Sequence, residues 1–397
     1  MKDVIVCDVG SHSIKLGFAG DHVPSLVVPC FYGKSDRGAK ETVYFGAEAL
    51  EESGVNRIEL KLVFDAAGTV KEWRRFEELF TWALRKLVGD DENAGVFSSL
   101  KLFLPRPANM NNDELQKLSE LLFEKLKFRA VTMQPEAALI LMVQGHQTTG
   151  LIVEAGAGSI RLLPVYHGHA IVAANRRIPI GGRVMTRHLV KLLGDQGYPL
   201  NAKRDFDLIV SDPTKQSFCY AAPSYAEEKR CSMETSLLLE QTQLLDGTEV
   251  DLEKERFETV ECMFNPSLLG IEAKGIGHAI VELVATSIPL DCVKDIVSRI
   301  ILSGGLSRIP GLLERLQAEV RTQFRDEKQW NPRFREEKNW TPLQVENISV
   351  ELANEEFSLF HGASIVGDAI GMKREFWVTQ NDYKRDGVPG LLKKCRL

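Results

Sequence analysis

The stretch IVCDVGSHSIKLGFAGD, at residues 5–21, has a counterpart in LIVEAGAGSIRLLPVYHG, at residues 151–168. Each begins with an apolar run, continues through an acidic residue and a glycine turn, and ends in a second apolar run that carries a basic residue. This pattern predicts two strand–turn–strand units. A single hairpin of this kind is common, but two copies in one chain indicate a duplicated grip that can hold a polyphosphate from both sides of a cleft.

The first turn has the groups that a phosphate requires. Its backbone N–H groups can point at phosphate oxygens, because Gly10 permits a close approach. Ser11 and Ser13 add hydroxyl donors, and Lys15 adds a positive charge. Asp8 is expected to hold the water shell of Mg²⁺. The alternative interpretation is an ordinary hairpin in which Lys15 forms a salt bridge.

The second turn keeps only part of this chemistry. Gly156 and Gly158 retain the backbone donors, and Glu154 retains the carboxylate, whereas Ala157 offers no side-chain group. Two further glycine turns follow apolar strands, in IPIGG at 178–182 and in LSGG at 302–305. A strand that ends at bare backbone before a helix can receive a phosphate or a flat ring, or it can simply pack tightly.

Composition limits the class of protein. The 397 residues are 44% hydrophobic, which allows a large core and two or more domains or lobes. Apolar strands alternate with helical patterns, and this indicates an α/β architecture. A net charge of −6 argues against direct nucleic-acid binding. Seven scattered cysteines without a CxxC pair indicate neither a zinc site nor a disulfide framework. The sequence predicts no leader and no membrane insertion, hence a soluble cytoplasmic or nuclear protein.

The order of these motifs resembles actin and the actin-related proteins, in the superfamily that also contains sugar kinases and Hsp70 chaperones. The resemblance covers nearly the whole chain, through segments such as KLGFAGD (15–21), TTGLIVEAG (148–156) and IILSGG (300–305). Two stretches, 181–201 and 375–394, are similar to the actin-related proteins of the complex that nucleates branched filaments.

The resemblance implies an actin-like two-lobed α/β fold, with a mixed five-stranded sheet and flanking helices in each lobe around a nucleotide cleft. The predicted ranges are 1–141 with 347–397 for the first lobe and 142–346 for the second, small subdomains at 33–66 and 179–280, and a charged, tryptophan-containing insertion at 322–343.

The resemblance also implies ATP or ADP with Mg²⁺ or Ca²⁺ as cofactor. The residues that it places at the nucleotide are Asp8, Gly10, Ser11, Lys15, Glu154, Gly156, Gly158, Gly182, Arg183, Lys215, Gln216, Gly304, Gly305 and Leu306. Asp8 and Glu154 would hold the metal through water. Glu136 stands where the family positions the attacking water, and a carboxylate there can accept a proton.

Several positions depart from the family pattern, among them Gln216 in place of a glutamate that bonds the ribose, and three of them bear most on nucleotide binding. Ala157 replaces an aspartate, Arg161 replaces a histidine, and Glu356 replaces a lysine that flanks the adenine. These changes predict nucleotide binding that is weakened or lost, with slow or absent hydrolysis, so that the protein is at most a slow ATPase.

Segment 31–50 is short and charged where actin carries a long mobile loop that clasps the next subunit. Homopolymers are therefore not expected. The resemblance implies an ATP-binding, actin-related subunit of a cytoskeletal complex that nucleates or branches actin filaments, with the nucleotide as a conformational clamp. The expected partners are other actin or actin-related subunits and scaffold proteins, in the cytoplasm.

Two alternatives stay open. One is a structural pseudo-actin without ATPase activity, in a chromatin-remodelling or dynein/dynactin-type complex, which would allow a nuclear location. The other, a small-molecule kinase, has less support because no sugar site with a catalytic aspartate is recognisable between the two phosphate turns.

Two local features complete the predictions. The repeat FRDEKQWNP at 324–332 and FREEKNWTP at 334–342 is interpreted as a solvated insertion, with a partner-binding element anchored by Trp330 and Trp340 as the alternative. Pro213 is expected to begin a helix, because proline inside a helix costs about 3 kcal/mol.

Overall fold

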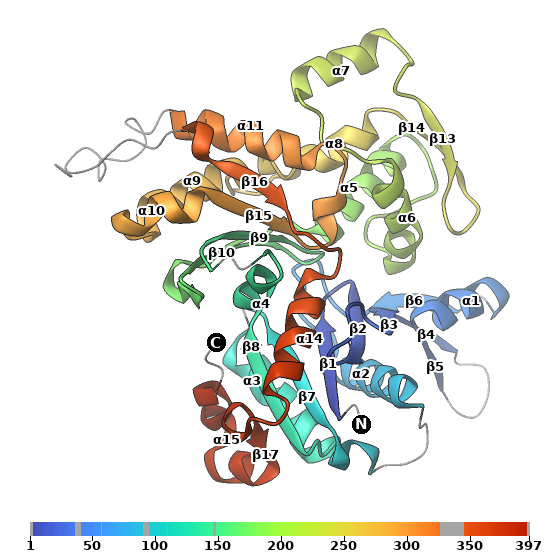
Figure 1. The fold of residues 1–397 in the computed structure, drawn as a ribbon. Coiled ribbons are helices and arrows are strands. Elements are labelled where there is room, and N and C mark those ends of the chain that lie inside the picture. The colour runs from blue at the N-terminus through green and yellow to red at the C-terminus, as the bar shows by residue number, and fades with distance from the viewer. Residues whose placement is uncertain are drawn as a thin grey trace.

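The structure, a computed structural model, describes residues 3–35, 41–56, 58–89, 95–108, 110–145, 148–325 and 345–394. Within them the chain forms two lobes, each built on a β-sheet with helices packed against it (Figure 1). The predicted two-lobed α/β fold is confirmed. The insertion predicted at 322–343, with its repeat and tryptophans, lies outside the described residues beyond Arg325.

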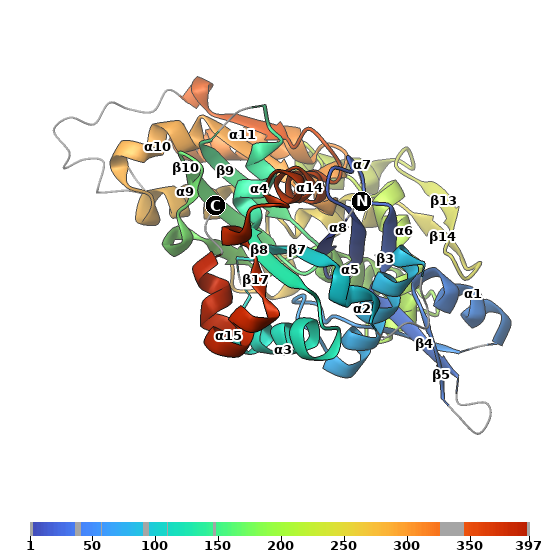
Figure 2. The ribbon, with the colours of Figure 1, turned by 60° about the horizontal axis from the view of Figure 1, so that its bottom comes forward.

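The first lobe contains the sheet β17-β8-β7-β1-β2-β3. Its strands are β1 (Val4–Val9), β2 (Ser13–Phe18), β3 (Leu26–Pro29), β7 (Lys101–Arg106), β8 (Ala130–Pro135) and β17 (Val378–Thr379). Its helices are α2 (Trp73–Val88), α3 (Asn112–Glu120, followed by a π-helical turn at Leu121–Lys125), α4 (Glu136–Met142), α14 (Ser358–Ile370) and α15 (Gln380–Lys394). Figure 2 shows β17 and α15 next to α3.

Strand β1 shows why an uninterrupted apolar run forms a strand in this lobe. Ile5 and Cys7 lie in a core with α2 and α3, whereas Val4 and Val6 lie in a second core with α14. Successive side chains of a strand point to opposite faces of the sheet. Both faces of β1 are therefore buried, and the strand needs no polar residues in alternation.

The second lobe contains the sheet β11-β10-β9-β15-β16, with β12 also paired to β10. Its strands are β9 (Gly150–Ala155), β10 (Ile160–Tyr166), β11 (His169–Ala170), β12 (Arg176–Ile178), β15 (Arg299–Ser303) and β16 (Ser349–Leu352). Its helices are α5 (Gly182–Asp195), α8 (Glu255–Glu261), α9 (Ile276–Ser287), α10 (Leu290–Val297) and α11 (Leu312–Arg325). In the described part of the chain each sheet thus has six strands rather than the expected five, because the short strands β17 and β12 extend the pairing.

Helices α4 and α14 pack against each other between the two sheets. Ala137 and Ile140 of α4 contact Ile152 of the second sheet, whereas Leu139 contacts the first-lobe core. A Cβ atom at Gly362 of α14 would lie 2.1 Å from the carbonyl oxygen of Leu139, so only glycine allows this close helix contact. These two helices connect the lobes at the middle of the molecule.

Each lobe carries a smaller unit, and the two units meet. The first has β4 (Phe31–Ser35), β5 (Thr42–Phe45), α1 (Gly46–Asn56) and β6 (Glu59–Leu62); the second has α6 (Asp205–Phe218), α7 (Tyr225–Glu234), β13 (Glu240–Gln243) and β14 (Glu249–Leu252). Leu60 and Leu62 pack against Leu208 and Ile209 of α6. The lobes therefore touch on this side as well (Figure 1). The residue ranges predicted for lobes and subdomains stay predictions.

Helix α6 corrects one expectation. It runs through Pro213 instead of beginning there. Ile209 and Val210 before the proline, and Thr214 and Lys215 after it, are all buried. Their packing outweighs the backbone hydrogen bond that proline removes.

Candidate functional site

The first hairpin, β1–β2, pairs an acid with a base across its two strands. Asp8 lies opposite Lys15 in the strand register, and Lys15 Nζ is 3.0 Å from Asp8 Oδ2. The Gly10 amide donates to the Ser13 carbonyl over 3.1 Å, which closes the turn. Burial by itself lowers the pKa of Lys15, but Asp8 more than compensates and the pKa is raised. The lysine is therefore firmly charged.

The second hairpin, β9–β10, repeats this arrangement. Glu154 lies opposite Arg161, with 2.8 Å between a guanidinium nitrogen and a carboxylate oxygen. The Gly156 amide donates to the Ser159 carbonyl, again over 3.1 Å. The duplicated motif thus folds into two equivalent hairpins, one in each lobe.

Arg161 reaches beyond its own hairpin. Its Nη2 atom also lies 2.9 Å from Oε2 of Glu136, a side chain at the start of α4 that is only 2% exposed. The other oxygen of Glu136 accepts the Ala108 amide over 3.0 Å. Burial raises the pKa of Glu136 to about 7, against the opposing effect of Arg161. The carboxylate predicted to position water is therefore held on both oxygens.

The turns of the two lobes also touch directly. A Cβ atom at Gly158 would lie 2.6 Å from Cα and 2.8 Å from N of Gly68, in the turn between β6 and α2. Gly68 has φ +81°, a left-handed conformation that favours glycine. Two backbones can approach this closely only because both residues are glycine.

Three side chains join the lobes next to this contact. Arg183 of α5 donates to the carbonyl of Ser11 in the first hairpin. Arg177 of β12 donates to the carbonyl of Ala67 over 2.8 Å. In the other direction, His12 Nδ1 of the first hairpin lies 3.7 Å from Asp212 of α6.

Lys215 is enclosed by the second lobe. Its Nζ atom donates to the carbonyl of Gly182 (3.0 Å), to Thr186 Oγ1 (2.8 Å) and to Asp212 Oδ1 (2.6 Å). The neighbouring Gln216 donates to the other oxygen of Asp212 over 2.7 Å. Burial alone raises the pKa of Asp212, but Lys215 and His12, together with hydrogen bonds from Lys215 and Thr186, lower it.

The glycine turn after β15 faces the second hairpin. Gly304 has φ +88°, and a Cβ atom there would lie 2.5 Å from the Ala155 carbonyl. Leu306 lies 3.3 Å from the Cβ position of Gly182, whereas a Cβ atom on Gly305 would meet open space. The turn therefore combines close packing with one accessible stretch of backbone.

The whole length of the chain resembles one family. The Actin family pattern matches residues 1–207 and 198–396. The chain belongs to the actin family. It is 29% identical over 401 residues to actin-related protein 2 of Acanthamoeba castellanii, covering 99% of this chain and 98% of that protein. Proteins of the same name from Arabidopsis thaliana (28%) and Oryza sativa subsp. japonica (27%) match over the same shares of both chains.

This actin-family structure brings most of the predicted site residues together. Ser11 of the first hairpin and Gly158 of the second both lie beside Gly68. Gly182 lies beside Ala157 of the second hairpin, and Leu306 and Lys215 lie beside Gly182. Gln216 is bonded to Asp212, next to Lys215. Glu356, in contrast, is an exposed residue of the β16–α14 loop. The roles of the predicted residues at a nucleotide stay predictions.

Sequence reasoning missed four residues of the site. Gly68, Thr186 and Asp212 touch or bind residues that were predicted, and Arg177 binds the carbonyl of Ala67, next to Gly68. Only Asp212 left a signal, because an acid three residues before a lysine lies on the same helical face. Gly68 and Arg177 depend on how the lobes pack, and Thr186 depends on how α5 packs against α6.

Actin-family proteins bind a nucleotide with a divalent metal, and the residues present do not fit the metal. The carboxylates of Asp8 and Glu154, which would hold its water shell, are paired with Lys15 and Arg161. Ala157 supplies no further oxygen ligand, and Mg²⁺ needs oxygen ligands in near-octahedral geometry. The side-chain cations of Lys15 and Arg161 therefore lie beside the carboxylates that a metal ion and its water would need.

The donors fit the phosphates of a nucleotide better. Lys15 and Arg183 carry positive charge at the first turn, and Arg183 Nε is buried without a hydrogen bond to any residue that the structure describes. A buried unpaired donor carries a free-energy penalty that a phosphate oxygen would remove.

Proposed function

We propose that this actin-family protein is an actin-related subunit of a cytoskeletal complex that nucleates or branches actin filaments. Proteins named actin-related protein 2 match it from end to end. In the short segment 31–50, strands β4 and β5 pair antiparallel, and the shortness of this segment favours a dedicated subunit over a homopolymer. Its partners would be other actin or actin-related subunits and scaffold proteins of the cytoplasm.

The observation that carries the mechanism is the position of Arg161 between Glu136 and Glu154. The lobes are held together by the protein's own ion pairs and backbone contacts. A nucleotide that binds Lys15 and the glycine turns would add to them as a conformational clamp, since its higher affinity for the closed state shifts the population towards it.

Hydrolysis is expected to be slow or absent for a geometric reason. A general base must reach the attacking water and accept its proton. Glu136 is only 2% exposed, and its two oxygens already accept the Ala108 amide and the guanidinium of Arg161, whose charge favours the ionised carboxylate over the protonated one. The protein is therefore proposed to hold its nucleotide without turning it over.

The first experiment is to purify the protein, denature it, and identify the released nucleotide by chromatography. We expect ATP, bound with equal affinity in Mg²⁺ and in EDTA. The reverting variant A157D/R161H provides the comparison, because it restores an oxygen ligand and removes the guanidinium; its binding should become dependent on Mg²⁺. ATP turnover that is lost in Glu136→Gln would contradict the proposed mechanism.

Complex membership needs a separate test. The tagged protein is expressed in its own cells and purified by affinity and size exclusion. We expect co-purification of another actin-family subunit in equal amount, and the loss of this complex in Lys15→Met if the nucleotide clamp supports assembly. A wild-type protein that purifies as a monomer would overturn the proposed membership in a complex. A complex that stays intact in Lys15→Met would overturn the proposed nucleotide clamp.

The second candidate function is a structural pseudo-actin that needs no nucleotide. It is favoured by the pairing of Asp8, Glu136 and Glu154 with cations of the chain itself. A nucleotide-free protein in the first experiment, still assembled with its partners, would select this candidate.

A further inference from the structure

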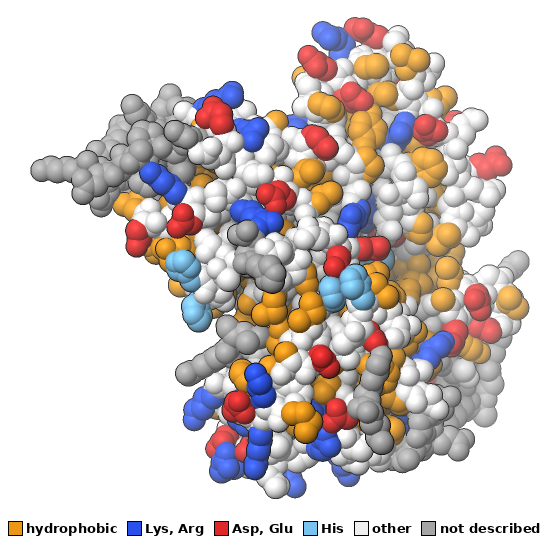
Figure 3. Space-filling model, viewed as in Figure 1, with side chains coloured by type: hydrophobic (Ala, Val, Ile, Leu, Met, Phe, Trp, Pro, Cys, Tyr) orange, Lys and Arg blue, Asp and Glu red, His pale blue; other side chains and the backbone are white. Residues whose placement is uncertain are grey.

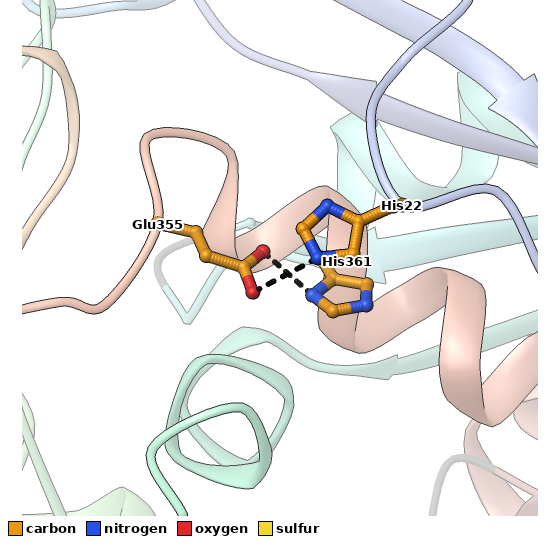
Figure 4. A group of neighbouring side chains, drawn as sticks. All are labelled: His22, Glu355 and His361. Atoms are coloured by element: carbon orange, nitrogen blue, oxygen red, sulfur yellow. Dashed lines mark ion pairs between the residues drawn. The ribbon is translucent and has the colours of Figure 1, made fainter.

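A second group of polar side chains lies outside the hairpin site. His22 follows β2, Glu355 lies in the loop between β16 and α14, and His361 lies in the first turn of α14 (Figure 4). Their ligand atoms all lie within 4.8 Å of one another. Figure 3 shows histidine and acidic side chains together on the surface where the two lobes join.

We propose that His22, Glu355 and His361 bind a divalent transition-metal ion, with Zn²⁺ as the best fit. Two imidazoles and one carboxylate are typical zinc ligands, and three protein ligands leave a fourth position for water. Mg²⁺ and Ca²⁺ prefer oxygen ligands only. The His22 side chain is 67% exposed, so an ion can reach the site from solvent.

The distances support a tetrahedral ion. Zinc bonds of about 2.0–2.1 Å place neighbouring ligand atoms about 3.3 Å apart in a tetrahedron. His22 Nε2 and Glu355 Oε1 are already 3.4 Å apart. His361 Nδ1 and Glu355 Oε2 are 2.6 Å apart, so this pair must separate by about 0.7 Å to reach the tetrahedral spacing.

The ring nitrogen of His361 gives a second, independent indication. Nδ1 is buried and makes no hydrogen bond to the described residues, although Oε2 of Glu355 is only 2.6 Å away. The two atoms are thus close without the alignment that an N–H donor requires. The two rings also lie 4.1 Å apart, centroid to centroid, close enough for both to reach one ion. A bound ion would give this buried nitrogen the partner that it lacks.

The three ligands are held in place by their own backbones. The turn that carries His22 is tied to α14, because Gly20 N donates to the Ser364 carbonyl and Ser364 Oγ donates to the Phe18 carbonyl. The loop of Glu355 is fixed by Ser358 Oγ, which donates to the Glu355 carbonyl over 2.6 Å. Preorganised ligands lose little entropy when the ion binds.

The ion would link the turn after β2 to the segment through which the chain passes from the second lobe back into the first. Asn354, one residue before the ligand Glu355, is bonded to Gln144 and Val143 after α4. The metal would therefore stiffen the connection between the lobes, independently of any nucleotide.

The test is Zn²⁺ titration of the full chain by calorimetry, with Mg²⁺ in excess. We expect one strong site in the wild type. Affinity should fall at least about 100-fold in H22Q/H361Q, since even the loss of outer partners costs 10–100-fold. The matched control is H278Q, which changes an exposed histidine on α9. Circular dichroism confirms that each variant is folded.

Cobalt spectroscopy separates this site from the cysteines. Co²⁺ bound by nitrogen and oxygen should show visible d–d bands without a thiolate charge-transfer band, and these bands should disappear in H22Q/H361Q. Unchanged zinc affinity in the double variant, or a thiolate spectrum in the wild type, would overturn the proposal.

Discussion

The two hairpins of the site have the same turn and the same cross-strand charge pair, yet they differ in reach. Lys15 pairs with Asp8 inside the first hairpin. Arg161 pairs with Glu154 inside the second and also with Glu136 on α4. A lysine is a compact point charge, whereas a guanidinium has several donors in a planar fork. The cation of the second hairpin therefore reaches a separate element, whereas Lys15 pairs with a carboxylate of its own hairpin.

The difference shows how two copies of one motif can differ in the contacts that their cations make. The strand register and the turn hydrogen bond are equal in both copies. One side-chain type, arginine in place of lysine, converts a local pair into a connection between β10 and α4. The predictions below test this contrast.

The largest effect is expected for Arg161→Met. It leaves the buried Glu136 and the half-buried Glu154 without their cation, and breaking a buried pair in this way costs about 3–5 kcal/mol of unfolding free energy. The loss should be larger at pH 8 than at pH 5, because burial raises the pKa of Glu136 and the folded state retains its proton at lower pH. Urea denaturation measures both.

Lys15→Met is the matched variant in the first hairpin. It removes one partner of a single, partly exposed pair, so we expect a loss of about 1–3 kcal/mol. An equal loss in the two variants would show that Arg161 does not connect the elements more strongly than Lys15.

The second contrast is between the glycines of the two turns. In Gly158→Ala the new Cβ meets the backbone of Gly68 at 2.6 Å, so the lobes must move apart, at a cost of about 1–3 kcal/mol. In Gly10→Ala it meets only the Ser13 carbonyl at 3.0 Å and the flexible Lys15 amine at 3.1 Å. Thermal unfolding should show the larger loss for Gly158→Ala, and the reverse order would contradict the direct contact between lobes.

Asp212 is expected to make the stability of the protein depend on pH in acid. The folded-state pKa of Asp212 lies below its usual value of 3.8. Its stabilising effect is therefore complete above about pH 4 and is lost as the pH falls further, with a slope of at most about 1.4 kcal/mol per pH unit. Between pH 5 and pH 3, the unfolding free energy measured by denaturation should fall less steeply with pH in Asp212→Asn than in the wild type. The difference in slope corresponds to the uptake of at most one proton on unfolding. If the unfolding free energies of the two proteins have the same pH dependence, another carboxylate is responsible for the loss of stability in acid.

The smallest effect is expected for His12→Asn. The histidine is half exposed and lies 3.7 Å from Asp212, a geometry worth about 0–1 kcal/mol. Any loss should vanish in the Asp212→Asn background, as a double-mutant cycle can show. A loss as large as that of Arg161→Met would mean that the first hairpin also joins the lobes by charge.

Much of the local structure could be predicted from the sequence. The apolar runs at Val4–Val9 and Gly150–Ala155 are strands, and the salt bridge of Lys15, held open as an alternative, is present. The start expected for a helix at Pro213 was wrong, because packing on both sides of the proline outweighed the local cost. Strands of two or three residues, such as β17 and β12, leave too short a pattern to detect.

The contacts between lobes could not be predicted in the same way. Gly68 and Gly158, or Ser11 and Arg183, are far apart in the chain, and their contact depends on how two complete lobes pack. The cluster of His22, Glu355 and His361 is also formed by segments from opposite ends of the sequence.

The sequence by itself determined the hairpins, the charge pairs within them and the family, because these depend on neighbouring residues and on the order of motifs. Only the tertiary structure decided which cation stands beside which carboxylate across the site. The reason is physical: strand register acts over a few residues, whereas the position of Arg161 beside Glu136 is set by the packing of β10 against α4.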